Sequence, residues 1–202
     1  MPSTRSRHHP LWIAATVATA MIAVGHRTPA AQADKAAQAA NPDAAAIAGF
    51  MERVNQYVAV HQKLKGTLPK LPQEATPEQI DQRERALGAL IQSARKTARR
   101  GDLFTPEMTV VIKRLMTQVF SGPEGQLLRS SVMDENVKDL PLRVNQRFPD
   151  GIPMTTMPPA VLKALPDLPE QMQYRFVALQ FVLLDPHANV VADFIPGVLP
   201  AK

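Results

Sequence analysis

The stretch that decides the fold is Phe176-Val-Ala-Leu-Gln-Phe-Val-Leu-Leu184, followed by Asp185-Pro-His-Ala-Asn189 and then Val190-Val-Ala-Asp-Phe-Ile195. The first run is rich in β-branched and aromatic side chains, and only Gln180 interrupts it. Its length and composition are typical of a buried strand. The middle segment has the Asp, Pro and Asn residues of a turn. The stretch therefore predicts a β-hairpin.

Pairing the two predicted strands about the turn gives the hairpin two different faces. The expected cross-strand pairs are Leu184 with Val191, Val182 with Asp193, and Phe181 with Phe194. One face is entirely apolar and holds Val177, Leu179, Phe181, Leu183, Ala192 and Phe194. The other face is mixed and holds Tyr174, Phe176, Gln180, Val182, Asp193 and Ile195. We expect the apolar face to pack against the rest of the chain.

The chain before the hairpin is mainly helical. Helices are predicted from Asn41 to about Gly66, from Thr76 to Gly101, from Thr105 to Phe120, and from Gly122 to about residue 135, with a short helix at 158–165. Alternating apolar residues at 140–148 predict a further strand. Helices first and strands last indicate an α+β fold, with an N-terminal layer of three to four helices on a small antiparallel sheet that ends in the C-terminal hairpin.

The first 33 residues have the pattern of a bacterial export signal. Arg5 and Arg7 precede an apolar run from Leu11 to Val24, and Ala31-Gln-Ala33 is a small-residue cleavage site. Cleavage after Ala33 would deliver the protein to the periplasm or the medium, although the segment could instead be kept as an anchor. Residues 34–40 would then be a flexible connector, and 41–202 a single domain. No later run is long enough to span a membrane.

Charge and cysteine content exclude several function classes. The whole chain carries 23 Lys and Arg against 18 Asp and Glu, but three of the arginines lie in the predicted signal, which leaves a net charge of +2. A nucleic-acid partner is therefore not expected. The chain has no cysteine, which rules out disulfides, thiolate metal sites and thiol catalysis. We expect no cofactor.

The mixed hairpin face is the first candidate for a binding site. Tyr174, Gln180 and Asp193 would be exposed there together, although Asp193 could instead pair with Gln180, with Arg175 or with an arginine of the strand predicted at 140–148. A metal site or a hydrolase centre is the alternative, with Asp185, His187 and Asp193 as its groups. That alternative requires the three side chains to converge on one pocket. The chain has no G-x-S-x-G, H-E-x-x-H or glycine-rich phosphate motif.

Two other surfaces are candidates for interactions. Arg95, Lys96, Arg99 and Arg100 cluster near the end of the second predicted helix, where cations complement the helix dipole. An anionic surface or a lipid headgroup is a possible partner for this cluster. The apolar stripe of helix 41–65 could also support self-association.

Most of the chain that follows the predicted signal resembles known proteins. The spacing Leu168-Pro-x-x-Met172-x-Tyr-Arg-Phe-Val177, followed by Leu183-Leu-Asp185 and Ala188-Asn-Val-Val-x-Asp-Phe-Ile195, resembles a group of secreted bacterial proteins of unknown function. The hairpin alone also resembles that of small periplasmic proteins linked to nickel and cobalt homeostasis. The first resemblance implies an exported protein and carries no activity. We therefore expect a non-catalytic exported domain that binds a protein or an envelope component.

Overall fold

A computed structural model of the protein describes residues 41–134, 140–152, 157–177 and 179–199. These ranges contain the helices α2 (Pro42–Lys65), α3 (Pro77–Ala94), α4 (Pro106–Val119), α5 (Gly122–Asp134) and α6 (Pro159–Ala164), and the strands β1 (Gln173–Val177), β2 (Gln180–Asp185) and β3 (Val190–Pro196). The predicted α+β fold is confirmed. The predicted signal and connector lie outside the described residues. None of the described helices is long and apolar enough to cross a membrane.

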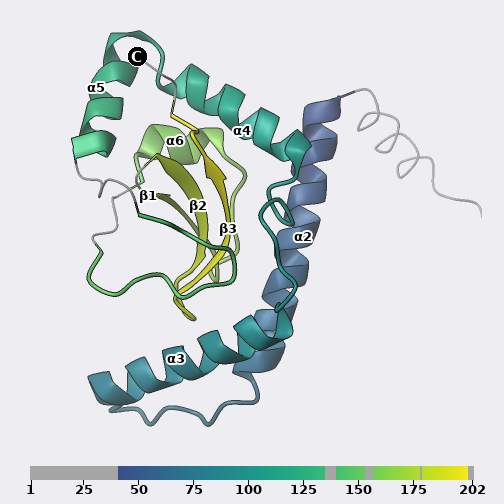
Figure 1. The fold of residues 1–202 in the computed structure, drawn as a ribbon, viewed down its shortest axis with the longest axis vertical. Helices are drawn as coiled ribbons and strands as arrows, with labels where there is room; N and C mark the ends of the chain where they lie inside the picture. The colour runs from purple at the N-terminus through teal and green to yellow at the C-terminus, as the bar shows by residue number, and fades with distance from the viewer. Residues whose placement is uncertain (1–40, 135–139, 153–156, 178, 200–202) are drawn as a thin grey trace, which may run out of the picture.

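Helices α2, α3 and α4 surround the sheet on three sides, as Figure 1 shows. Their starts are the predicted ones. The Asn41 side chain accepts hydrogen bonds from the backbone N–H groups of Asp43 and Ala44, and Thr76 forms a capping box with Gln79. Because each cap satisfies N–H groups that have no partner within the helix, the sequence fixes these starts locally.

Helix α3 ends at Ala94, earlier than the predicted end at Gly101. The side-chain amide of Asn145 donates to the backbone carbonyls of Gln92 and Arg95. It thereby satisfies carbonyls that would otherwise bond to a further helical turn. Residues 95–104 consequently form a loop that lies against β3, and this loop carries much of the candidate site below.

The sheet has three antiparallel strands in the order β1-β2-β3. The single strand predicted over Phe176–Leu184 is wrong, because the chain reverses between Val177 and Gln180, which pair across a tight turn. That turn contains no Gly, Pro or Asn in the sequence, so the usual signal of a reversal is missing. Leu179 marks the turn instead, with a side chain that is 48% exposed.

A β-bulge changes the register of the hairpin. Leu184 pairs with Val191 as predicted, but Leu183 pairs with Asp193, so Ala192 is an extra residue in β3. The predicted pairs of Val182 with Asp193 and of Phe181 with Phe194 are therefore wrong. Because side chains alternate between faces, a shift of one residue moves the rest of β3 to the other face.

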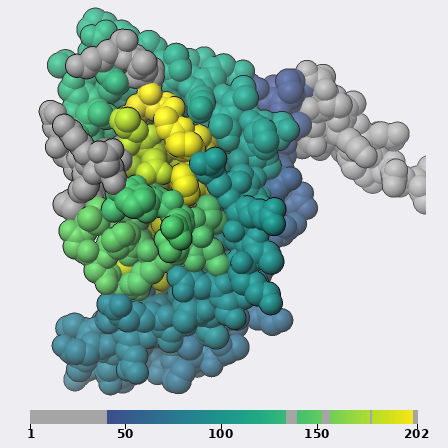
Figure 2. Space-filling view, in the orientation of Figure 1, coloured from purple at the N-terminus to yellow at the C-terminus, as the bar shows by residue number. Residues whose placement is uncertain are grey.

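The two faces of the sheet are covered by different parts of the chain. Against the helices lie Tyr174, Phe176, Phe181, Leu183 and Ile195. The opposite face carries Val177, Val182, Leu184, Val191 and Phe194, packed against side chains of segment 140–152. Figure 2 shows this green segment over the lower part of the sheet, with yellow β3 surface visible above it. Both faces are therefore buried.

Segment 140–148 is not the predicted regular strand. It makes one isolated bridge, between Arg147 and Val190, and two hydrogen bonds to the backbone of Val191. Asn145 interrupts it with a positive φ of 61°, a conformation that Asn tolerates better than most residues. The segment thus lies along the outer edge of β3 without extending the sheet.

Candidate anion-binding site

The buried carboxylate of Asp193 holds the loop that follows α3. Asp193 has 0% exposure, and its Oδ2 accepts hydrogen bonds from the backbone N–H groups of Leu103 and Phe104, each at 2.9 Å. The N–H of Gly101 also donates to it, at 3.1 Å. Four backbone donors, with that of Phe194 itself, surround the carboxylate. A buried carboxylate needs such donors to offset its lost hydration.

Gly101 allows this arrangement. Its φ of +95° lies in the region that side-chain-bearing residues avoid. This conformation lets the chain turn so that the N–H groups of Gly101, Leu103 and Phe104 converge on Asp193. The same turn presents Arg99 and Arg100 on the outside of the loop.

Three arginines surround a shallow hollow beside this loop. The hollow has a volume of about 510 Å³.

 The residues that line it come from the loop after α3, from segment 140–152 and from β3: Ala98, Arg99, Arg100, Leu142, Arg143, Val144 and Phe194. We refer to this set as the basic hollow. It is open to solvent on one side and has apolar side chains in its walls.

The three guanidinium groups of the basic hollow have no carboxylate partner among the described residues. Arg99, Arg100 and Arg143 are all exposed, and none of them belongs to the ion pairs found in the described part of the chain. The Arg100 guanidinium lies 5.8 Å from the centre of the Phe194 ring. Asp193 lies below this surface, and its oxygens are occupied by backbone donors. The positive charge of the basic hollow is therefore free to attract an anion.

Arg95 belongs to the predicted basic cluster but has a structural role. Its guanidinium lies 4.8 Å from the centre of the Tyr57 ring and donates to the carbonyl of Ala192. These contacts connect the end of α3 to α2 and to the bulge in β3. Arg95 therefore does not contribute to the basic hollow.

The second buried carboxylate, Asp185, connects α2 to the hairpin. Its Oδ2 accepts hydrogen bonds from Tyr57, at 3.0 Å, and from Nδ1 of His61, at 2.6 Å. Its Oδ1 accepts from the backbone N–H groups of His187 and Ala188, each at 3.0 Å. Burial is the main reason that the pKa of Tyr57 is raised well above its ordinary value, and the charge of Asp185 raises it further. Tyr57 therefore stays protonated and donates.

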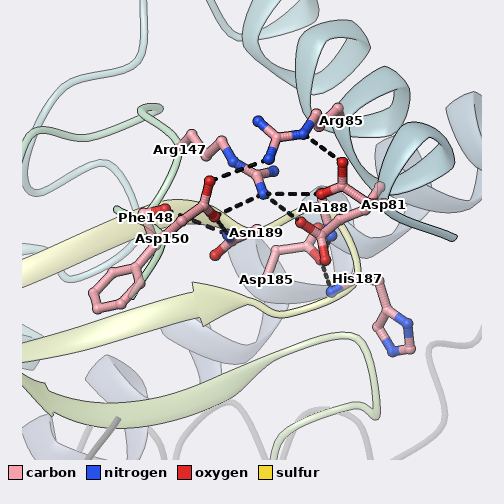
Figure 3. A network of polar contacts seen from close by, with 10 residues as sticks. Asp81, Arg85, Arg147, Phe148, Asp150, Asp185, His187, Ala188 and Asn189 are labelled. Carbon is pink, nitrogen blue, oxygen red and sulfur yellow. Dashed lines mark hydrogen bonds and ion pairs between the residues drawn. The ribbon is translucent and has the colours of Figure 1, made fainter. Parts of the chain in front are cut away.

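The structure does not bring Asp185, His187 and Asp193 together in one pocket. Asp185 and Asp193 are both fully buried and bind separate sets of donors. His187 is exposed, and Figure 3 shows its imidazole directed away from the polar network around Arg147 and Asp150. Within the described ranges, no group of three or more His, Asp or Glu side chains could hold a metal ion. The alternative of a hydrolase or metal centre at these residues is not supported by their geometry.

The expectation that Tyr174, Gln180 and Asp193 are exposed together on one face is wrong. Tyr174 is 4% exposed, and its hydroxyl donates to the carbonyl of Pro166. Gln180 pairs with Val177 across the turn, and its amide donates to the carbonyl of Leu140. Tyr174 and Asp193 belong to the helix-covered side of the sheet, because the extra reversal and the bulge change which residues share a face.

The apolar stripe of α2, for which the sequence suggests self-association, packs against the sheet and the loop after α3. Phe50, Val54 and Tyr57 are buried in the main core, and the Phe50 ring stacks on the Phe104 ring with centroids 5.2 Å apart. This stripe therefore covers the sheet and the loop that Asp193 holds.

Sequence reasoning identified part of the basic hollow and missed the rest. Arg99 and Arg100 belong to the predicted basic cluster, but Arg143 lies in a segment for which the sequence predicts a strand. The sequence predicts that Phe194 lies on the face that meets the helices. The alternation of Leu142, Arg143 and Val144 indicates an exposed arginine between two partly buried residues, yet no local pattern shows that it lies beside Arg100.

Comparison of the chain with protein-family models, curated proteins and solved structures gives no match.

Proposed function

We propose that this chain is an exported, non-catalytic domain that binds a phosphate-bearing component of the cell envelope at the basic hollow. The observation that carries the proposal is the convergence of Arg99, Arg100 and Arg143 without a carboxylate partner in the described part of the chain. Export is supported by the basic residues, apolar run and Ala-x-Ala site at the N-terminus. An exported chain would meet such a ligand in the periplasm or outside the cell.

Phosphate is the anion that best fits this set of side chains. A guanidinium group presents its N–H donors in a planar fork that matches two oxygens of a phosphate group. Three such groups from two separate segments can approach a phosphate from different sides. The apolar side chains of Leu142, Val144 and Phe194 in the walls of the basic hollow suit a ligand that carries apolar atoms next to its phosphate.

A non-catalytic role is supported by the state of the chain's buried polar groups. Each oxygen of Asp185 and Asp193 already accepts hydrogen bonds from the protein. A general base needs a free position within hydrogen-bond distance of the substrate proton. Neither carboxylate offers one, and neither is at the surface. Both carboxylates have a structural role.

The test compares two triple variants with the same change in net charge. One variant is Arg99→Gln, Arg100→Gln, Arg143→Gln, and the control is Lys63→Gln, Lys113→Gln, Lys163→Gln, whose lysines are exposed and lie outside the basic hollow. Pyrophosphate serves as the soluble probe, and vesicles of phosphatidylglycerol or phosphatidylcholine serve as the lipid probes. Titration calorimetry and vesicle co-sedimentation measure the binding.

The proposal predicts binding to pyrophosphate that the hollow variant weakens at least about tenfold, because charge-assisted hydrogen bonds contribute more than neutral ones. The control should bind like the unchanged protein. If the phosphate source is a lipid, the same pattern appears with phosphatidylglycerol vesicles and not with phosphatidylcholine. Equal weakening in both variants would show a general charge effect, which contradicts a specific site.

A further inference from the structure

A second pocket lies between α6 and β1, two elements that Figure 1 shows beside each other. Its volume is about 310 Å³, which is at the small end of the range for small-molecule sites. We refer to it as the β1 pocket. It shares no lining residue with the basic hollow. The apolar part of its lining consists of Met157, Leu162, Pro166, Leu168 and Met172.

The apolar lining of the β1 pocket suits a small apolar group. Leu162 of α6 is 46% exposed here, so it presents apolar surface that a ligand would remove from water. Met157 and Met172 are buried beside it. Because methionine is unbranched and flexible, a wall with two methionines can adapt to apolar groups of different shape. The lining therefore favours an aliphatic or thioether group without selecting one exact shape.

Arg175 brings a positive charge to the β1 pocket. Among the described residues, its guanidinium donates to the carbonyl of Tyr174 and to the side-chain oxygen of Gln173, which are both neutral. Its Nε is buried and has no hydrogen-bond partner in that part of the chain. Burial lowers the pKa of Arg175, because the charged group loses hydration. A carboxylate from a ligand would accept from its unused N–H groups and offset this loss.

Asp167 brings a negative charge to the same pocket. Its side chain is exposed, and it belongs to none of the ion pairs found in the described residues. Burial raises the pKa of Tyr174, and the charge of Asp167 raises it further, so this carboxylate lies near the Tyr174 side chain. Because Asp167 and Arg175 form no ion pair with each other, each charge is available to a ligand.

The two charges and the apolar lining together define one class of ligand. A simple anion would pair with Arg175 but would be repelled by Asp167, and a simple amine would meet the reverse combination. A zwitterion satisfies both side chains at once. A free α-amino acid carries its carboxylate and its ammonium group on one carbon, and an apolar amino acid adds a side chain that fits the lining.

We propose that the β1 pocket binds a free apolar α-amino acid, such as leucine or methionine, with its carboxylate on Arg175 and its ammonium group on Asp167. The side chain of the ligand lies against the apolar wall that includes Leu162 and Met172. Gln173 holds the Arg175 guanidinium in place through the hydrogen bond between their side chains. This site is separate from the basic hollow, and the proposal does not depend on phosphate binding there.

The first test removes one charge of the ligand at a time. L-leucine, 4-methylpentanoate, which lacks the amino group, and 3-methylbutylamine, which lacks the carboxylate, are titrated into the unchanged protein by calorimetry. Leucine should bind, and each analogue should bind at least about tenfold more weakly, because one charge-assisted hydrogen bond is lost. Absence of leucine binding at millimolar concentration, or equal binding of all three compounds, would overturn the proposal. This series needs no variant of the protein.

The second test assigns each ligand charge to its residue. Arg175→Gln should abolish the preference for leucine over 3-methylbutylamine, and Asp167→Asn should abolish the preference for leucine over 4-methylpentanoate. The controls Lys113→Gln and Glu74→Gln, whose exposed side chains lie outside the β1 pocket, should keep both preferences. If the preferences survive Arg175→Gln and Asp167→Asn, or if the controls lose them, the pocket is not the site and the proposal is overturned.

Discussion

The Oδ2 atom of Asp193 accepts a 2.9 Å hydrogen bond from the backbone N–H of Phe104, a residue 89 positions earlier in the chain. This contact joins the C-terminal hairpin to the loop between α3 and α4. It fixes the position of Phe104 in the core, where its ring lies 5.7 Å from that of Phe181. It also determines how the adjacent residues Arg99 and Arg100 are presented. The basic hollow therefore depends on a carboxylate that no ligand would touch.

The first prediction concerns Asp193. Asp193→Asn should lower the free energy of unfolding by about 3 kcal/mol, because the amide nitrogen cannot accept the N–H bonds that the carboxylate oxygen accepts. Asp102→Asn is the control, since Asp102 is exposed and, among the residues that the structure describes, accepts only from the Arg99 N–H. That change should cost less than about 1 kcal/mol. Urea unfolding measures the free energy of unfolding of both variants. An equal loss of stability in the two would contradict the structural role of the Asp193 carboxylate.

The second prediction concerns His61. His61→Phe should destabilise the protein by about 3–5 kcal/mol, because it leaves the buried Asp185 carboxylate with one side-chain partner fewer. His187→Phe should change the stability by no more than about 0.5 kcal/mol, because its side chain is exposed and only its backbone N–H contacts Asp185. Chemical denaturation of the two variants checks this difference. A similar cost for both histidines would be inconsistent with the buried pair.

The third prediction concerns the contact between α3 and the hairpin turn. A Cβ atom at Gly88 would lie 2.7 Å from the carbonyl oxygen of Ala188. Gly88→Ala should therefore lower the stability by about 1–3 kcal/mol, since two backbone segments must move apart. The control Gly49→Ala meets only the end of the flexible Arg53 side chain. It should be neutral or stabilise α2 by up to about 1 kcal/mol. Thermal unfolding separates the two outcomes.

The fourth prediction concerns alkaline pH. Burial raises the pKa of both tyrosines of the chain, Tyr57 and Tyr174. A raised pKa in the folded state means that the protonated phenol contributes stability below about pH 10, and that this contribution is lost as the pH rises toward the folded-state value. The unfolding free energy should therefore fall more steeply above about pH 10 in the unchanged protein than in Tyr57→Phe, Tyr174→Phe. Parallel pH profiles would contradict this account.

The parts of the fold that sequence predicts well are those with local causes. Asn41, Thr76 and Thr105 satisfy N–H groups within three residues of themselves, so their helix starts can be read from short motifs. The turn at Asp185–Asn189 also has a local cause, because the Asp185 side chain accepts hydrogen bonds from the backbone N–H groups of the two residues that follow Pro186.

The errors have long-range causes. The early end of α3 depends on Asn145, and the bulge at Ala192 depends on the loop that Asp193 holds and on Arg95, which bonds to the Ala192 carbonyl. Neither leaves a periodic signal in the sequence. Because of the bulge, Asp193 lies on the helix-covered side of the sheet. Because the chain turns after Val177, Gln180 lies at the start of β2. For these two reasons the predicted binding surface of Tyr174, Gln180 and Asp193 is wrong.

The most direct test of the central claim is a titration with pyrophosphate, followed by NMR of the arginine Nε–Hε signals. The account predicts that Arg99, Arg100 and Arg143 shift together with one dissociation constant, while Arg85 and Arg114, which are paired with carboxylates, do not move. Shifts spread over all exposed arginines, or no shift at the three arginines of the basic hollow, would contradict it.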